Sequence, residues 1–116
     1  MQFDIKRVKI VTFAPEENIP AIREAVCNAG AGIIGNYDFC TSTQKSLGTY
    51  IPNDNANPYI GTNNKLSIEK ELRFEVICDI SRVENVLFEL RKAHPYEEPA
   101  IDIIPLLSES DFDKRW

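Results

Sequence analysis

The order of two kinds of apolar spacing constrains the fold of this sequence more than any other feature. Residues 5–13 alternate as a β-strand does, and residues 19–29 carry apolar side chains at helical spacing. The same pair of patterns recurs over residues 66–78 and 83–90. The apolar positions of the two predicted helices are Ile19, Ile22, Val26 and Ala29 in the first, and Val83, Val86, Leu87 and Leu90 in the second. The chain therefore repeats a strand followed by a helix that has one apolar face to bury.

Local signals predict where both helices begin and end. Asn18 is placed to cap the first helix, and Gly30 lies just beyond its last turn, where a left-handed residue stops a helix. The S-R-V-E sequence at residues 81–84 predicts a capping box at the start of the second helix. Because Pro95 disfavours helical backbone before it, we expect this helix not to continue past His94.

The segment between the two repeats predicts strands and one long loop. Residues 36–41 alternate as a strand, a polar T-Q-K-S turn follows, and residues 48–52 predict a return strand. Residues 53–64 are rich in Asn, Pro and Gly, which predicts a loop by turn chemistry. Its two large apolar residues, Tyr59 and Ile60, either pin the loop to the core or belong to a functional surface.

A final strand over residues 100–107 gives the order strand, helix, strand, strand, helix, strand. This order predicts an α+β fold, the ferredoxin-like βαββαβ sandwich, in which two helices cover one face of an antiparallel sheet. Residues 1–107 are expected to form one domain, and residues 108–116 a polar tail that is either mobile or docked through its two aromatic residues. The other sheet face, which carries Ile77, stays uncovered, and so we expect a homo-oligomer.

Composition and charge argue against several classes of partner. The net charge is −5 and the 13 Lys and Arg residues form no run, so we expect no nucleic acid and no anionic membrane as partner. No apolar stretch approaches the ~20 residues that cross a bilayer, and the N-terminus lacks a secretory pattern. Cys27, Cys40 and Cys78 are odd in number and far apart, as is typical of reduced thiols. We therefore expect a cytoplasmic protein.

Gly30, Gly32 and Gly35 have the G-x-G-x-x-G spacing of dinucleotide-binding loops. In those loops a strand precedes the glycines and a helix follows them, because the free N–H groups of the helix N-terminus hold the phosphates. Here the predicted helix comes before the glycines. We therefore interpret Gly30 as a helix stop and the other two as turn residues.

The densest chemical cluster is the H-P-Y-E-E-P sequence that begins at His94, the only histidine in the chain. Imidazole and carboxylate groups bind divalent cations and transfer protons near neutral pH, and here His94 lies beside Tyr96, Glu97 and Glu98. A histidine at the end of a helix equally serves to cap the terminal carbonyls. The local chemistry leaves a structural role and a functional site both open.

Four segments in this order resemble the PII/CutA-like domain that is inserted in bacterial YqfO-type members of the Nif-three-like family. They are GAGIIGNYDFC, NPYIG, ELRFEV and HPYEEPAIDIIPL, and the resemblance covers residues 5–107. Such domains also occur as small free-standing proteins, which is the expectation here. The H-P-Y-E motif is also similar to that of trimeric CutA proteins, which implies a ferredoxin-like subunit and a homotrimer.

The resemblance implies a site but not the identity of its ligand. The metal ligands of full-length relatives lie in the halves that flank the domain, so no dinuclear centre is inherited by these residues. The sequence S-L-G-T-Y-I-P at residues 46–52 lacks the first glycine of the expected G-x-G-x-F-x-P run, which puts the hairpin geometry in question. We predict a ligand site at a subunit interface made of His94, Tyr96, Glu97, Glu98, Tyr37 and Cys40, with His94 and Glu97 as ligands if a divalent metal ion binds.

Three functions fit these residues. The first is a non-enzymatic module that binds a metal ion or a small ligand between subunits and regulates a partner. The second is a small hydrolase with His94 as base and Glu97 or Glu98 as orienting group, although the sequence has no motif for an activated nucleophile. The third is a purely structural module, in which Tyr96 and the two glutamates join subunits.

Overall fold

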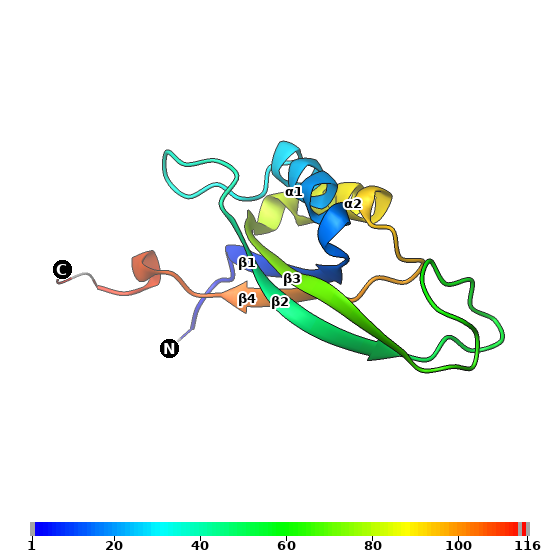
Figure 1. The fold of residues 1–116 in the computed structure, drawn as a ribbon. Helices are drawn as coiled ribbons and strands as arrows, with labels where there is room; N and C mark the ends of the chain where they lie inside the picture. The colour runs from blue at the N-terminus through cyan, green and yellow to red at the C-terminus, as the bar shows by residue number, and fades with distance from the viewer. Residues whose placement is uncertain (1, 114, 116) are drawn as a thin grey trace.

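The computed structural model describes residues 2–113 and 115 and contains a four-stranded sheet in the order β2-β3-β1-β4. All neighbouring strands are antiparallel. Figure 1 shows both helices on the same face of this sheet. The helices and strands are β1 (Arg7–Ala14), α1 (Ile19–Asn28), β2 (Thr41–Tyr50), β3 (Ser67–Asp79), α2 (Val83–Ala93) and β4 (Ile101–Leu106). The predicted ferredoxin-like βαββαβ fold is confirmed.

The core lies between the sheet and the helices because each has one apolar face. Alternation along β1 and β3 directs a set of side chains towards the helices. Apolar residues spaced three or four apart on each helix pack against this set. This set is at most 2% exposed and includes Val8, Ile10, Phe74 and Val76 of the strands with Ile22, Val26, Val86 and Leu90 of the helices. Each such side chain stabilises the fold by ~1.5–3 kcal/mol, so packing holds the short helices in place.

Both helices begin differently from the prediction. A 3-10 turn precedes each one, η1 (Glu16–Asn18) before α1 and η2 (Ile80–Arg82) before α2. Arg82 occupies the N-cap of α2 and no side chain caps this helix, so the capping box predicted at 81–84 is wrong. Asn18 occupies the N-cap of α1, but its side chain makes no capping bond. In each case the first helical N–H donates to the first carbonyl of the turn, which satisfies it without a side-chain cap.

The ends of the helices agree with the prediction. The glycines follow α1, with Gly30 at φ +114°, Gly32 at +79° and Gly35 at +57°, backbone angles that favour glycine. The chain therefore turns after α1 and presents no helix N-terminus to a phosphate. Helix α2 ends at Ala93, and His94 already has extended backbone.

The second strand differs most from the prediction. The strand predicted from Asn36 begins at Thr41, and the turn and return strand predicted within residues 43–52 are wrong because β2 is continuous. Ile34 and Tyr37 exchange two backbone hydrogen bonds of 2.9 Å, which close a turn where the strand was expected. Strand β2 lies at the sheet edge and most of its side chains are exposed, so it has no apolar alternation to mark it.

Strands β2 and β3 form a long hairpin that gives the molecule an elongated shape of 54 × 30 × 25 Å. Figure 1 shows the hairpin loop, residues 51–66, at the far end from the chain termini. The predicted loop at 53–64 is confirmed. Ser46, where the family pattern has glycine, pairs with Glu71 in regular register, so its substitution leaves the hairpin intact.

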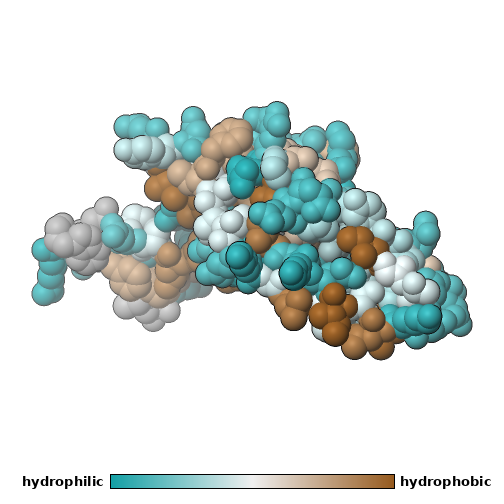
Figure 2. All heavy atoms as spheres, in the orientation of Figure 1, coloured by the Kyte–Doolittle hydropathy of each residue, from teal (hydrophilic) through white to brown (hydrophobic). Residues whose placement is uncertain are grey.

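Large apolar side chains are exposed on this hairpin, and Figure 2 shows apolar surface gathered over it. They are Leu47, Ile51, Leu66 and Ile68, which are between 58% and 66% exposed. The sheet face opposite the helices also carries apolar residues, among them Ile77 and the exposed Ile104. Isolated apolar residues are ordinary on protein surfaces, but a continuous set on one face favours contact with another protein surface.

The C-terminal tail is docked as far as Phe112, whose ring lies 5.6 Å from that of Phe3. A short 3-10 turn, η3 (Glu109–Asp111), precedes Phe112, and Oδ2 of Asp111 accepts a 2.7 Å hydrogen bond from the backbone N–H of Ser108. Trp116, the other aromatic of the tail, lies outside the described residues. Within the described part of the chain, neither helix is long and apolar enough to cross a membrane.

Candidate functional site

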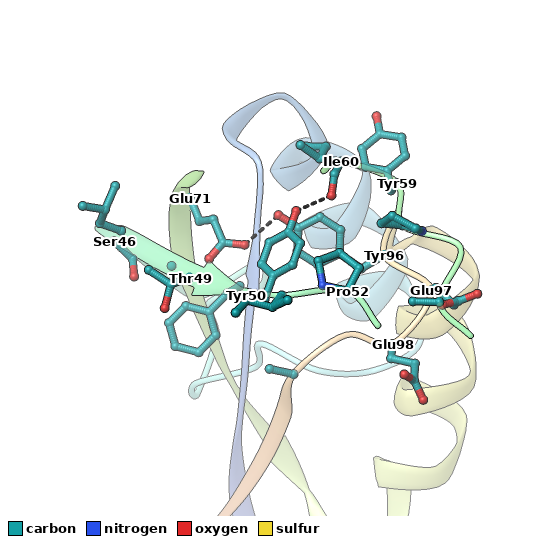
Figure 3. A pocket seen from close by; sticks show the side chains of 17 residues that line it. Ser46, Thr49, Tyr50, Pro52, Tyr59, Ile60, Glu71, Tyr96, Glu97 and Glu98 are labelled. Carbon is teal, nitrogen blue, oxygen red and sulfur yellow. Dashed lines mark hydrogen bonds between the residues drawn. The ribbon is translucent and has the colours of Figure 1, made fainter. Parts of the chain in front are cut away.

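A pocket of about 530 Å³ opens where the hairpin meets the segment between α2 and β4. We call it the Tyr96 pocket and define it by six side chains, shown in Figure 3: Tyr50, Tyr59, Glu71, Tyr96, Glu97 and Glu98. These side chains come from the end of β2, the hairpin loop, β3 and the H-P-Y-E-E-P segment. Pro95 and Pro99 restrict the backbone on both sides of Tyr96, which limits the directions its side chain can take.

Tyr96 and Glu71 form a hydrogen bond to a charged acceptor inside the pocket. The Tyr96 hydroxyl donates a hydrogen bond of 2.6 Å to Oε2 of Glu71. Burial raises the pKa of Tyr96, and the bond to Glu71 raises it further. The phenol therefore stays protonated at neutral pH and acts as a donor to the carboxylate.

Two further tyrosines complete an aromatic wall. The Tyr50 ring lies 6.5 Å from that of Tyr96, and the Tyr59 ring lies 6.3 Å from it on another side. The Tyr50 hydroxyl donates a 2.5 Å hydrogen bond to the carbonyl of Ile60, which anchors the hairpin loop (Figure 3). Tyr50 stands where the family pattern has phenylalanine, so this anchoring bond depends on the additional hydroxyl.

His94 does not line the pocket but holds Tyr96 in position. Its ring is 6% exposed, with Nε2 2.9 Å from the carbonyl oxygen of Phe13 and Nδ1 accepting a 3.2 Å hydrogen bond from the N–H of Tyr96. These partners assign a neutral ring that donates through Nε2. Burial lowers the pKa of His94, which favours the same neutral form.

Glu97 and Glu98 border the mouth of the pocket and are exposed. Glu97 Oε1 accepts a 3.1 Å hydrogen bond from the backbone N–H of Asn57, which joins the segment after α2 to the hairpin loop. The structure thus brings Tyr96, Glu97 and Glu98 together in one cavity, with His94 packed directly behind them.

Tyr37 and Cys40 lie elsewhere in the subunit. They belong to the loop before β2, whereas the pocket lies at the Tyr50 end of that strand. A strand of ten residues spans ~33 Å, so the two groups are far apart within one chain. The expectation that Tyr37 and Cys40 meet the H-P-Y-E-E-P segment across a subunit interface stays a prediction.

The arrangement does not assemble a metal centre within one subunit. Among residues 2–113 and 115, no group of three or more His, Cys, Asp or Glu side chains is placed to hold a metal ion. Both ring nitrogens of His94 already have partners in the protein. A metal ion held by His94 and Glu97 therefore stays a prediction that requires a rearrangement or ligands from a second subunit.

Sequence reasoning missed Tyr50 as a site residue and missed Glu71 altogether. Glu71 reads as an ordinary polar position of an alternating strand, and its bond to Tyr96 spans 25 positions in the sequence. No local pattern marks such a contact. For Tyr59, the loop composition did give a signal, and the structure places its ring against Tyr96.

Comparisons with known proteins agree with this fold. The chain is 42% identical over 103 residues to a protein of Halalkalibacterium halodurans named GTP cyclohydrolase 1 type 2 homolog, covering 89% of this chain and 28% of that protein. A Bacillus cereus protein related to NIF3 superposes with a TM-score of 0.77 at 34% identity, covering 90% of this chain and 27% of that one. No protein-family model matches the sequence.

A third comparison defines the class of fold. The PII-like protein CutA from Nostoc sp. PCC 7120 superposes with a TM-score of 0.64 at 16% identity, covering 93% of this chain and 86% of the CutA chain. The antiparallel sheet with two helices on one face is thus a PII/CutA-like domain. The chain is a PII/CutA-like domain similar to the one in NIF3-related proteins, and it spans about a quarter of the length of the curated relatives that it matches.

Proposed function

We propose that this domain is a non-enzymatic binding module that takes up a small ligand in the Tyr96 pocket and regulates a partner protein. The observation that carries the proposal is the pocket itself, where three aromatic rings surround a Tyr96–Glu71 hydrogen bond. Cavities of this size with apolar walls and a few polar groups are typical of small-molecule sites. The activity in the name of the curated relatives belongs to proteins of which this chain spans about a quarter, and the proposal does not include it.

The chemistry of the pocket supports binding over catalysis. The residues that line it, all within the described part of the chain, include no histidine and no cysteine. His94, the base of the alternative hydrolase, has both ring nitrogens engaged by Phe13 and Tyr96. A hydroxyl nucleophile such as that of Ser46 or Thr49 would therefore lack the histidine base on which the alternative hydrolase depends.

The position of the pocket suggests how a ligand would reach a partner. The hairpin loop and the segment after α2 both line it, and they are joined by the Glu97–Asn57 hydrogen bond and the tyrosine contacts. A ligand that touches both segments would favour one arrangement of the loop over others. A partner protein that binds the exposed apolar residues of the hairpin would respond to this change in the loop.

We further propose a cytoplasmic homo-oligomer, with a trimer as the expected form. The apolar residues on the open sheet face and on the hairpin support burial against other copies of the chain. The three cysteines, which form no disulfide, are in keeping with a reducing compartment.

A thermal-shift screen of neutral, anionic and cationic small molecules tests the proposal. A compound present at 100 times its Kd stabilises the folded state by ~2.7 kcal/mol, which raises the melting temperature by several degrees. We expect this shift to disappear in Tyr96→Ala and Tyr59→Ala and to persist in Phe88→Ala, on the outer surface of α2. If no compound of any charge stabilises the protein, or if the shifts survive both tyrosine substitutions, the binding function is wrong and the structural alternative gains support.

A further inference from the structure

The walls of the Tyr96 pocket carry charge of one sign. Three carboxylates, Glu71, Glu97 and Glu98, line it, and its lining residues include no lysine, arginine or histidine. On the open sheet face, the basic residues Lys9 and Arg73 both form ion pairs with Glu75 and not with Glu71. Within the described chain none of the three pocket carboxylates belongs to an ion pair.

Two lysines lie near Glu71 but on the other side of the sheet. Lys45 and Lys70 border a separate depression that shares Glu71 with the pocket. Lys45 is registered opposite Leu72, and Lys70 opposite Leu47, so both alternate to the face that carries Leu72, opposite to that of Glu71. The charge of Glu71 is therefore not neutralised from within the pocket.

Several hydrogen-bond donors at the pocket are already used within the protein. The hydroxyl hydrogens of Tyr96 and Tyr50 are already donated, to Glu71 and to the carbonyl of Ile60. The N–H of Asn57 is donated to Glu97. The hydroxyls of Ser46, Thr49 and Tyr59 can donate or accept, and the other groups left for a ligand are acceptors, namely carboxylate oxygens and carbonyl groups. A ligand that supplies donors therefore fits the pocket best.

The aromatic rings add a second preference of the same kind. Tyr50 and Tyr59 stand at tilts of 55° and 50° to Tyr96, with ring centroids 6.5 and 6.3 Å from it. The negative faces of such rings attract an alkylammonium or guanidinium group that lies within about 6 Å of them. An anion would instead meet three carboxylates and the negative faces of the rings.

We infer that the Tyr96 pocket binds a small organic cation, with its ammonium or guanidinium group between the Glu71 carboxylate and the tyrosine rings. This inference rests on the proposed binding function and names the chemical class of the ligand. The volume of about 530 Å³ accommodates an alkyl or aryl body besides the charged group.

Isothermal titration at pH 7 and low salt tests the inference with agmatine and choline as cationic probes, and with citrate and ATP as anionic probes. We expect both cations to bind and both anions to fail. In Glu71→Gln, which retains an acceptor for the Tyr96 hydroxyl but removes the charge, we expect the cations to bind about tenfold more weakly or worse. Glu84→Gln removes an equal charge from the exposed start of α2 and should leave their affinity unchanged.

The outcomes separate this inference from the proposed function. Binding of an anion or a neutral compound that is abolished by Tyr59→Ala would overturn the cation assignment and leave the binding function standing. Equal affinity of agmatine for the wild type and Glu71→Gln would overturn the assignment as well. A terminally blocked arginine peptide identifies the source of the cation: tighter binding of agmatine supports a free small molecule, and tighter binding of the peptide overturns it in favour of a protein side chain.

Discussion

His94 connects three parts of the chain through one buried ring. It follows α2, accepts a hydrogen bond from Tyr96 and lies against the carbonyl of Phe13 at the end of β1. A lone histidine beside carboxylates suggests a metal ligand or a base, but both of its nitrogens are used to hold the segment that carries Tyr96. His94 therefore contributes to the pocket by holding Tyr96 in position.

The stability of the fold should depend on pH through His94. Because burial lowers the pKa of His94 in the folded state below its usual value of 6.5, the unfolded chain binds a proton that the folded chain does not. The free energy of unfolding should therefore fall as pH decreases from 7.5 to 5.5, with a slope of at most ~1.4 kcal/mol per pH unit. Urea unfolding at several pH values measures this slope.

His94→Gln provides the control, since it removes the only histidine. This variant should be less stable but nearly independent of pH over the same range. The hydrogen bond from Arg73 lowers the pKa of Glu75 below 4.5, so its contribution is lost only at more acidic pH. A flat stability profile of the wild type between pH 7.5 and 5.5 would contradict a buried neutral His94.

At the scale of the elements, the connections between them decide which segments reach the pocket. The segment after α1, residues 29–40, reverses the chain and leads into β2 along the sheet edge. Strand β2 leads to Tyr50 at the far end of the sheet, and α2, which runs back along β3, ends at the same place just before Tyr96. The pocket thus depends on the length and register of the hairpin as much as on any motif.

The turn after α1 makes a quantitative prediction. Gly30 has φ of +114°, and a Cβ there would lie 2.6 Å from the Arg82 guanidinium, whereas Gly35 has φ of +57° and open space around it. Ala tolerates the second conformation better than the first, which lies outside the left-handed α region. Gly30→Ala should lower the free energy of unfolding by ~1 kcal/mol more than Gly35→Ala, as measured by urea unfolding. Equal costs would show that Gly30 is not constrained by its backbone.

For the whole molecule, the distribution of apolar surface is the dominant feature. The helices bury the central part of one sheet face, while the opposite face and the hairpin keep exposed apolar side chains. A subunit of 116 residues with this surface gains by burying it against copies of itself. The elongated hairpin increases the area available for such contact.

Sedimentation velocity at micromolar concentration tests the assembly. We expect an oligomer for the wild type and dissociation for Ile104→Glu, because this substitution places a charge on the open sheet face, where Ile104 is 41% exposed. Phe88→Glu alters an exposed apolar residue of α2 and should leave the oligomer intact. A monomeric wild type, or equal effects of both substitutions, would contradict burial of the open face.

Local periodicity determined the fold class and the core, while Gly30, Pro95 and the turn residues of 53–64 determined the ends of both helices and the long loop. The spacing of Phe74 and Val76 in the strand, and of Val86 and Leu90 in the helix, is enough to predict that they face the core. The period of a strand or a helix can be recognised from residues that are close in sequence. The H-P-Y-E-E-P motif and the family resemblance predicted Tyr96, Glu97 and Glu98 as site residues, and the structure brings these three to one pocket. Periodicity failed at Thr41–Tyr50, since an edge strand exposed on both faces has no such period.

Only the tertiary structure decided that Tyr96 faces Glu71, that Tyr50 and Tyr59 complete its surroundings, and that His94 is buried behind them. These contacts join residues far apart in the chain, and they exist because the hairpin and the segment after α2 pack at the same end of the sheet. Such long-range contacts depend on the packing of the whole chain, so no short motif is sufficient to predict them.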